Sequence, residues 1–273
     1  MDESGVLPRI LSLLALMAAL AVVEVWIPLR DDSSRRGGRW RPNLALTVLY
    51  FVVNAALTAG VLGIALWMEQ RQLGLLHRLR LPGAWALVLG IVVLDFFAYL
   101  VHVLMHRIPR LWRFHRVHHS DLEVDVTTTF RQHPLEAVLR FVFTSVPAVL
   151  LGVSPLATAI YRLLSGVNAL FEHANVRVLA AIDRGLRWAV VTPHMHKIHH
   201  SRARQETDSN YGNILSTFDR AFGTYTPTQR VGQVRYGLDE FDDSPQSFAA
   251  LLELPWNVRT RPDVTSSSSA SHP

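Results

Sequence analysis

Eleven of the 13 histidines lie between residues 102 and 200, and eight of them fall into three short groups. The spacings are His-x3-His, His-x2-His-His and His-x2-His-His, formed by His102 and His106, by His115, His118 and His119, and by His196, His199 and His200. Because residues three or four positions apart share one face of a helix, each group can direct its imidazoles to one point. Neutral imidazole binds iron, zinc, copper and nickel, and eight imidazoles exceed the roughly six ligands of one ion. The spacing therefore predicts a site for two metals.

The first group ends an apolar segment in which Asp95 and Tyr99 precede His102 and His106 at intervals of four, three and four residues. These four side chains form one stripe along a helix. We expect the stripe to face other helices, because a carboxylate that faces lipid costs several kcal/mol. Asp95 lies about 10 Å from His102 along the helix, at 1.5 Å per residue. We therefore expect it beside the ligands or along a substrate channel rather than on the metal.

The other five histidines stand alone in the sequence. His173 follows the returning arm of a predicted hairpin, which brings it to the same membrane surface as the three groups and favours a ligand role. His133 precedes a proline and favours a helix start, although contact with the ligands stays open. His194 lies off the face of the last group, where contact with the ligands and no role at all are equally open. His77 and His272 are assigned to a loop and to the tail.

Carboxylates near the histidines can hold imidazole N–H groups in place. Two divalent ions with only neutral ligands would carry a charge of +4, so nearby carboxylates or a bridging hydroxide are expected. The sequence does not single one out among Asp121, Glu123, Asp125, Glu172 and Asp208. The apolar stripe of Trp112, Phe114 and Val117 is assigned to packing.

Apolar segments long enough to cross a bilayer must position these groups. Three segments have the roughly 20 residues that a crossing needs, and they are Leu7–Leu29, Leu44–Met68 and Ala84–Met105. Two shorter arms, Leu135–Leu151 and Leu156–Leu170, predict a hairpin within the membrane. The predicted fold is an all-α integral-membrane bundle of three spans plus this hairpin, capped by a cytoplasmic His-rich helical region. We divide the chain into anchor spans (1–84), a His-bearing domain (85–262) and a disordered Ser-rich tail (263–273).

Arginine sets the expected orientation. Residues 30–41 contain five arginines and residues 107–116 contain four, against three in residues 69–82. The positive-inside rule therefore places residues 30–41, residues 107–116 and the histidine groups in the cytoplasm, with the N-terminus outside. Acidic residues at positions 2 and 3 predict a retained anchor rather than a cleaved signal peptide. The segment Ala180–Val191 predicts an interfacial helix. The four arginines of residues 107–116 are also assigned to lipid headgroups: Arg107, Arg110, Arg113 and Arg116.

Composition excludes several classes of protein. The 273 residues are 49% hydrophobic and 18% charged, and the chain has no cysteine. Disulfide scaffolds, iron–sulfur clusters and thiolate-ligated haem all need cysteine. No GxGxxG or Walker pattern marks a nucleotide site. The net charge of +5 would suit a nucleic-acid partner. The apolar content indicates a membrane protein instead, so we expect no nucleic-acid partner.

Longer motifs around the histidines are specific. Residues 111–120 read LWRFHRVHHS, residues 192–201 read TPHMHKIHHS, and residues 206–213 read ETDSNYGN, followed by DRAFGT at 219–224. Together with the His-x3-His pair, they resemble the fatty acid hydroxylase (sterol desaturase) superfamily of membrane di-iron enzymes over about residues 85–226. Here Val103 stands where relatives often have arginine, and Arg177 where some have a further histidine.

The resemblance implies a ligand set of nine histidines for two iron ions: His102, His106, His115, His118, His119, His173, His196, His199 and His200. Residues that would contact these ligands rather than the metals are His133, His194, Asp95, Tyr99, Asp208 and Asn210. It also implies that O2 is the co-substrate and that a C–H bond of a fatty acid, sterol or related lipid is hydroxylated or desaturated in the cell (inner) membrane. Since the chain has no cysteine and no nucleotide motif, the electrons must come from a separate donor, for which we expect a ferredoxin or a cytochrome-b5-like protein with its reductase.

Three other classes stay open. A zinc-dependent lipid hydrolase, or another non-redox metal-binding membrane protein, would use the same histidines without O2 or a donor. A haem-binding electron carrier would need single histidines on separate spans near mid-membrane, and the clusters argue against it. A metal transporter would need polar residues along a whole pore, whereas the second span offers little beyond Thr47, Asn54 and Thr58.

Overall fold

The computed structural model describes residues 6–30, 36–241 and 246–257, and the regular structure of these residues is helical apart from two isolated β-bridges. The long helices are α1 (Val6–Trp26), α2 (Arg36–Gln70), α4 (Gly83–Arg107), α6 (Pro134–Leu151) and α7 (Pro155–His173). The short ones are α3 (Leu75–Arg78), α5 (Pro109–His119), α8 (Ala180–Leu186), α9 (Pro193–His199), α10 (Arg204–Thr207), α11 (Thr217–Ala221) and α12 (Phe248–Glu253). The predicted all-α fold is therefore confirmed. The predicted tail and the acidic start of the chain lie outside the described residues.

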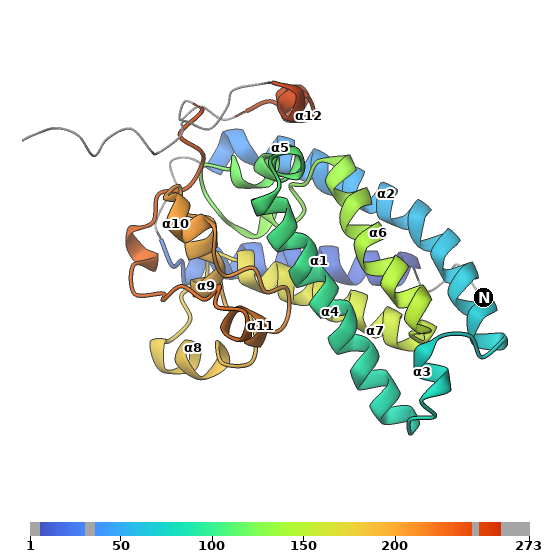
Figure 1. Cartoon of the computed structure of the whole chain (residues 1–273). Coiled ribbons are helices and arrows are strands. Elements are labelled where there is room, and N and C mark those ends of the chain that lie inside the picture. The colour runs from blue at the N-terminus through green and yellow to red at the C-terminus, as the bar shows by residue number, and fades with distance from the viewer. Residues whose placement is uncertain (1–5, 31–35, 242–245, 258–273) are drawn as a thin grey trace, which may run out of the picture.

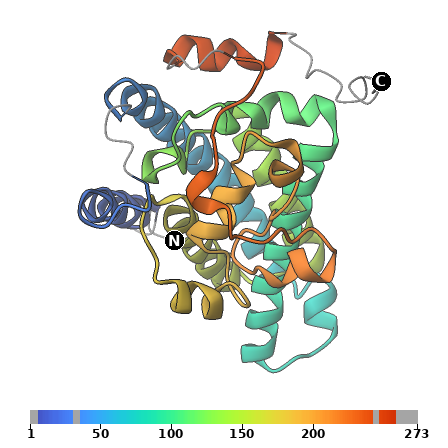
Figure 2. The same ribbon diagram turned by 90° about the vertical axis from the view of Figure 1, so that its left-hand side faces the viewer.

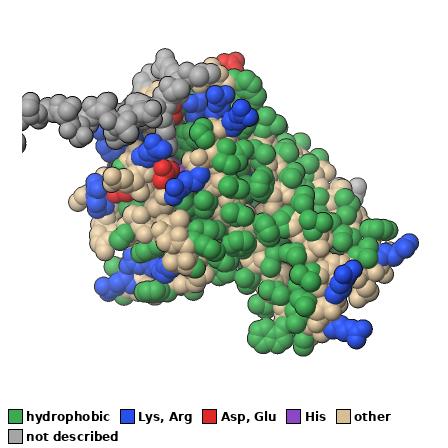
Figure 3. All heavy atoms as spheres, in the orientation of Figure 1, with side chains coloured by type: hydrophobic (Ala, Val, Ile, Leu, Met, Phe, Trp, Pro, Cys, Tyr) green, Lys and Arg blue, Asp and Glu red, His purple; other side chains and the backbone are tan. Residues whose placement is uncertain are grey.

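Helices α1, α2, α4 and α6 are long and apolar enough to cross a membrane. Large apolar side chains such as Val48, Trp85 and Leu150 stay exposed on them, and Figure 3 shows a broad apolar surface with basic side chains near its ends. An apolar face of this extent indicates contact with lipid. The protein is thus a membrane helical bundle, as predicted. The first span ends at Trp26 rather than Leu29, because Leu29 donates its backbone N–H to the Asn175 carbonyl instead of continuing the helix.

The predicted hairpin is formed by α6 and α7. Gly152 ends α6 in the left-handed region, at a φ of 70°, and Ser154 caps the N-terminus of α7 by accepting a hydrogen bond from the Ala157 N–H. A Cβ on Gly152 would lie 2.5 Å from the Leu73 carbonyl oxygen, so the tip of the hairpin packs tightly on the segment before α3. Because the two arms are antiparallel, His133 before α6 and His173 at the end of α7 come to the same end of the bundle.

The histidine groups lie at that end, on the last turns of α4 and α5 and on α9. Helices α8, α9, α10 and α11 lie on the left of Figure 1, opposite α3, and Figure 2 views this end face-on. Helix α4 packs against α5, α6 and α7, and α9 packs against α7. The turn from α4 into α5 is local in origin, because Pro109 disfavours a helical conformation at Ile108 and then starts the next helix at its first position. The long helices therefore act as a frame for the short ones.

A buried ion cluster ties α2 to the segment after α5. The Arg39 guanidinium donates to Asp121 at 2.7 Å and to Asp125 at 2.5 Å, and Asn43 donates to Asp121 at 2.9 Å. Of the five carboxylates that the sequence left open as acceptors for imidazole N–H groups, Asp121 and Asp125 therefore pair with Arg39 instead. Removing one partner of such a buried pair is costly, because it leaves the other charge uncompensated.

We expect the substitution Arg39→Ala to destabilise the fold by about 3–5 kcal/mol, since two buried carboxylates would lose their counter-charge. The measurement is the unfolding midpoint of the detergent-solubilised protein under a chemical denaturant. Arg113→Ala is the control, because Arg113 is exposed. Equal midpoints for the two variants would contradict a stabilising role for the cluster.

Two further sequence predictions are corrected. Arg116 is buried, not at the headgroups, and its guanidinium donates to the carbonyls of Leu254 and Asn257. The predicted interfacial helix over Ala180–Val191 ends at Leu186, because Val190 forms a β-bridge with Leu215.

Candidate metal centre

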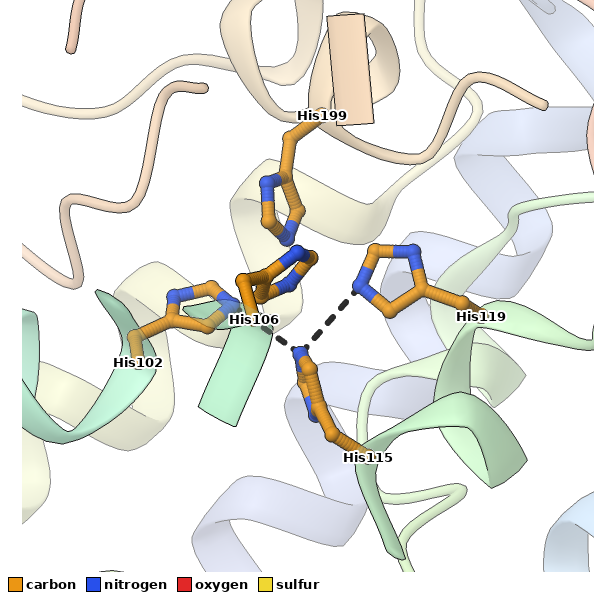
Figure 4. A group of neighbouring side chains, drawn as sticks. All are labelled: His102, His106, His115, His119 and His199. Atoms are coloured by element: carbon orange, nitrogen blue, oxygen red, sulfur yellow. Dashed lines mark hydrogen bonds between the residues drawn. The ribbon is translucent and has the colours of Figure 1, made fainter. Parts of the chain in front are cut away.

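Nine buried imidazoles meet at the histidine-rich end of the bundle, and they form two neighbouring clusters. Within each cluster the ligand atoms all lie within 4.8 Å of one another. The five-imidazole cluster consists of His102, His106, His115, His119 and His199. Figure 4 shows that these side chains point from different elements toward one shared space. The four-imidazole cluster consists of His118, His173, His196 and His200. Every histidine of the implied ligand set thus belongs to one of the two clusters.

Each His-x2-His-His motif divides its imidazoles between the clusters. On α5, His115 and His119 are four residues apart and enter the five-imidazole cluster, whereas His118 enters the other one. The motif of α9 does the reverse, and only its central histidine, His199, joins the five-imidazole cluster. The i and i+4 positions share a face while i+3 is turned away by about 60° at 3.6 residues per turn. One helix therefore serves two adjacent sites, and the prediction that each group directs its imidazoles to one point is wrong for both of these motifs.

The separations between ring nitrogens fit ligands of one ion. Adjacent Nε2 atoms lie 3.1 and 3.2 Å apart between His115 and its neighbours His102 and His119. In the four-imidazole cluster, successive Nε2 atoms are 3.0–3.1 Å apart along the series His118, His173, His196 and His200. Two nitrogen ligands at right angles, each about 2.1 Å from a metal, would lie about 3.0 Å apart.

Hydrogen bonds at the outer nitrogens decide which atoms face inward. The Nδ1–H groups of His102, His173 and His199 donate to backbone carbonyls, of Tyr211 at 2.9 Å, Ala169 at 2.8 Å and Ser209 at 2.7 Å respectively. A carbonyl only accepts, so the proton is on Nδ1 and each Nε2 carries a lone pair.

His115 is set in the same way, because its Nδ1–H donates to the Glu136 carboxylate at 2.7 Å. The lone pairs of His102 and His115 therefore face each other at 3.1 Å, and the Nε2 atom of His199 is buried with no hydrogen-bond partner. Converging lone pairs repel unless a cation lies among them. The donor set thus fits a metal ion.

The protonation state of the histidines of the α5 and α9 motifs also fits a metal site. Burial, and after it the neighbouring imidazoles, lowers the pKa of these groups well below the ordinary value: His115, His118, His119, His196, His199 and His200. A neutral ring is the form that binds a metal.

The sequence analysis missed Glu136. Its buried carboxylate accepts from His115 and also from the Arg140 guanidinium at 3.0 Å. A carboxylate and an arginine four residues apart on an otherwise apolar arm were the available signal, since such charges inside a membrane are rare without a function.

Two carboxylates from the candidate list lie next to the clusters. Asp208 lies 3.3 Å from His106 Nδ1, as an acceptor for that ring. Glu172 is buried beside the four-imidazole cluster, with one oxygen 3.9 Å from His196 Nε2.

Three other predicted neighbours of the ligands act on the loop that follows α10. Asp95 accepts from the Asn213 side chain and from the backbone N–H groups of residues 214 and 215. Tyr99 bonds through its hydroxyl to Thr224 at 3.0 Å. Asn210, at a φ of 52°, donates to the Met195 and Thr226 carbonyls. Asp95 thus holds the loop after α10, Tyr99 bonds to the segment after α11, and Asn210 ties the loop to α9 and to that segment. None of these hydrogen bonds goes to an imidazole, but the loop carries the carbonyls of Ser209 and Tyr211.

The two doubtful histidines point elsewhere. His133 caps α6 by accepting from the Leu135 N–H, and its ring packs between Phe114 and Trp256. His194 lies 3.3 Å from Asp183. Trp112, assigned to packing, has its ring centroid 5.0 Å from that of His106 and 5.3 Å from that of His119, so it forms part of the wall of the five-imidazole cluster.

A cavity of about 620 Å³ lies between the long helices beside the clusters. Its wall is mostly apolar and includes Val101, which precedes His102, and Ala169, whose carbonyl accepts from His173. Arg140, which pairs with Glu136, also lines it. A volume in the range of about 300–1,000 Å³ is typical of small-molecule sites. Its lining includes sequence neighbours of the ligands but none of the nine imidazoles.

The chain is similar in sequence to several proteins named as hydroxylases or monooxygenases. The chain is 31% identical over 186 residues to an ornithine lipid hydroxylase of Rhizobium tropici, covering 67% of this chain and 54% of that protein. It is 28% identical over 176 residues to the alkylglycerol monooxygenase of Homo sapiens, covering 64% and 37%. It is 29% identical over 143 residues to a cholesterol 25-hydroxylase-like protein of Danio rerio, covering 51% and 55%. The chain thus spans between about a third and about half of these relatives, and no solved structure matches it.

The family comparison covers the region that builds the site. The model of the fatty acid hydroxylase family matches residues 87–224, which is half of the chain and contains all nine imidazoles of the two clusters. The chain belongs to the fatty acid hydroxylase family.

Proposed function

We propose that the protein is a membrane-bound oxygenase that hydroxylates a C–H bond of a lipid at a centre of two iron ions, one in each cluster. The observation that carries the proposal is the pair of clusters with Nε2 lone pairs turned inward, in a chain whose relatives include a lipid hydroxylase and a monooxygenase. Iron held there would supply the redox chemistry that reduces O2 and oxidises the C–H bond. The relatives' names favour hydroxylation over desaturation.

The chain's own residues would prepare the site. The carbonyls of Ser209, Tyr211 and Ala169 keep three imidazoles in the tautomer that offers Nε2, and Glu136 does the same for His115. Hydrogen bonds of this kind orient ligands and raise their basicity. Asp208 places negative charge next to an otherwise neutral ligand set, which offsets part of the charge of the metals. Burial of all nine rings excludes bulk water.

The reaction sets the requirement for a partner. When one oxygen atom of O2 enters the lipid as a hydroxyl group and the other leaves as water, two electrons and two protons must be supplied. The chain has no cysteine for an iron–sulfur cluster and no nucleotide-binding motif. We therefore propose a separate donor, a ferredoxin or a cytochrome-b5-like protein with its reductase. We place the centre on the cytoplasmic side of the inner membrane, on the strength of the arginine distribution.

The second candidate is a zinc-dependent lipid hydrolase or another non-redox metal protein, because imidazole also suits zinc. Structural and catalytic zinc sites have three or four protein ligands. The presence of five imidazoles in one cluster favours a metal of higher coordination number.

We expect anaerobically purified protein to contain two iron ions per chain. Removal of the metal with a chelator should abolish lipid hydroxylation, and ferrous iron under anaerobic conditions should restore it. The measurements are metal analysis, Mössbauer spectroscopy, and mass spectrometry of the lipids after incubation with ¹⁸O2 and a reductant. Incorporation of ¹⁸O from O2 into the lipid supports the proposal. Zinc as the native metal, with turnover that does not depend on O2, would overturn it.

A further inference from the structure

The cavity beside the two imidazole clusters is lined by positively charged side chains. Three arginines line it, Arg9 of α1, Arg140 of α6 and Arg162 of α7, and none of its lining residues is acidic. Arg140 is neutralised by Glu136. For Arg9 and Arg162, no aspartate or glutamate of the described residues forms an ion pair. Among the described residues, Arg9 and Arg162 therefore bring two positive charges to the cavity without an acidic partner.

The surroundings of Arg162 show that it faces inward. Its guanidinium donates to the Ser145 hydroxyl at 3.2 Å and stacks 4.4 Å above the ring of Phe141, both on the opposite arm of the hairpin. Arg9 and Tyr50 line the same cavity as Arg162. Two guanidinium groups and a phenol hydroxyl from three different helices thus converge on the cavity.

Such an arrangement is costly when no anion is bound. A charged side chain inside a membrane bundle is normally paired, and an ionisable residue at such a place marks a binding site or pathway. Like charges that lie close together in an apolar setting also repel each other. Guanidinium groups match carboxylate and phosphate oxygens in geometry. An anion between Arg9 and Arg162 would remove both penalties.

We propose that the cavity binds a lipid through a headgroup oxyanion, held by Arg9 and Arg162 with Tyr50 as a further donor, while the apolar wall holds the lipid chain. This inference deepens the proposed function and rests on it, since it names the substrate class of that enzyme as a lipid with an acidic group. A carboxylate and a phosphate share the required chemistry.

The test is a binding measurement on the full chain in nanodiscs of zwitterionic phosphatidylcholine. The probes are a fluorescent long-chain fatty acid, its neutral methyl ester, and a lysophosphatidic acid with the same labelled chain. We expect the acid to bind more tightly than the ester. Arg162→Gln and Arg9→Gln should each weaken binding of the acidic probes by about tenfold to a hundredfold, the range for losing a hydrogen bond to a charged group, and leave the ester unchanged. The tighter of the two acidic probes identifies the headgroup as carboxylate or phosphate.

Arg78→Gln is the matched control, because Arg78 is an exposed arginine at the end of the bundle opposite the clusters and does not line the cavity. Arg162→Lys keeps the charge and should retain part of the preference for the acid. Equal binding of acid and ester by the native protein would overturn the inference, as would an unchanged preference in Arg162→Gln. Iron content and O2-dependent turnover are measured on the same samples. If they are normal while the preference is absent, only this inference fails; if they are absent from the native protein, the proposed function fails instead.

Discussion

Replacing His199 with alanine should abolish iron binding by the five-imidazole cluster and reduce hydroxylation to background. His199 contributes a buried Nε2 atom without a hydrogen-bond partner, and its ring lies 4.5–4.7 Å, centroid to centroid, from those of His102, His106 and His119. No other imidazole of α9 enters that cluster. Iron per chain should fall from two to one or less. Metal analysis, Mössbauer spectroscopy and activity are the measurements.

His194→Ala is the control for that experiment, because His194 lies on the same short helix but contacts Asp183 instead of the clusters. We expect it to retain both iron ions and nearly full activity. A His199→Ala protein with two iron ions and full activity would remove His199 from the ligand set. Loss of iron in both variants would instead indicate that α9 as a whole is sensitive to substitution.

Replacing Glu136 with glutamine should lower iron affinity or activity by about tenfold to a hundredfold, the usual effect of losing a group that orients a metal ligand. Glutamine keeps the size of the side chain and can still accept from His115, but it removes the negative charge that Arg140 and the imidazole share. Glu136 acts through His115 as a positioning residue. The informative readout is therefore the Mössbauer spectrum of the five-imidazole site and its iron affinity, in addition to turnover.

Two further variants make the result specific. Glu136→Asp keeps the charge and should recover part of the iron affinity, whereas Glu69→Gln, at a partly exposed position near the end of α2, should change nothing. Unchanged iron affinity in Glu136→Gln would show that the helix alone holds His115 in place.

The carboxylates show where prediction from sequence stopped. Asp121 and Asp125 lie within six residues of His119 in the chain, yet they pair with Arg39, which is about 80 residues earlier in the sequence. Glu136 is further from the histidine groups along the chain and is the residue that bonds to one of them. A short side chain reaches its partner only if two helices bring their faces together, and proximity in sequence carries no information about that.

The sequence by itself indicated the long apolar helices and the eight clustered imidazoles, because helix periodicity and apolar length are local properties. It indicated His173 through the predicted hairpin and the family resemblance. It also excluded cysteine chemistry. Only the tertiary structure decided how those imidazoles divide into sets of five and four, which carbonyls and carboxylates hold them, and that Arg9 and Arg162 meet at one cavity. These features depend on the rotation and register of helices that pack against each other, and many distant contacts set that geometry together.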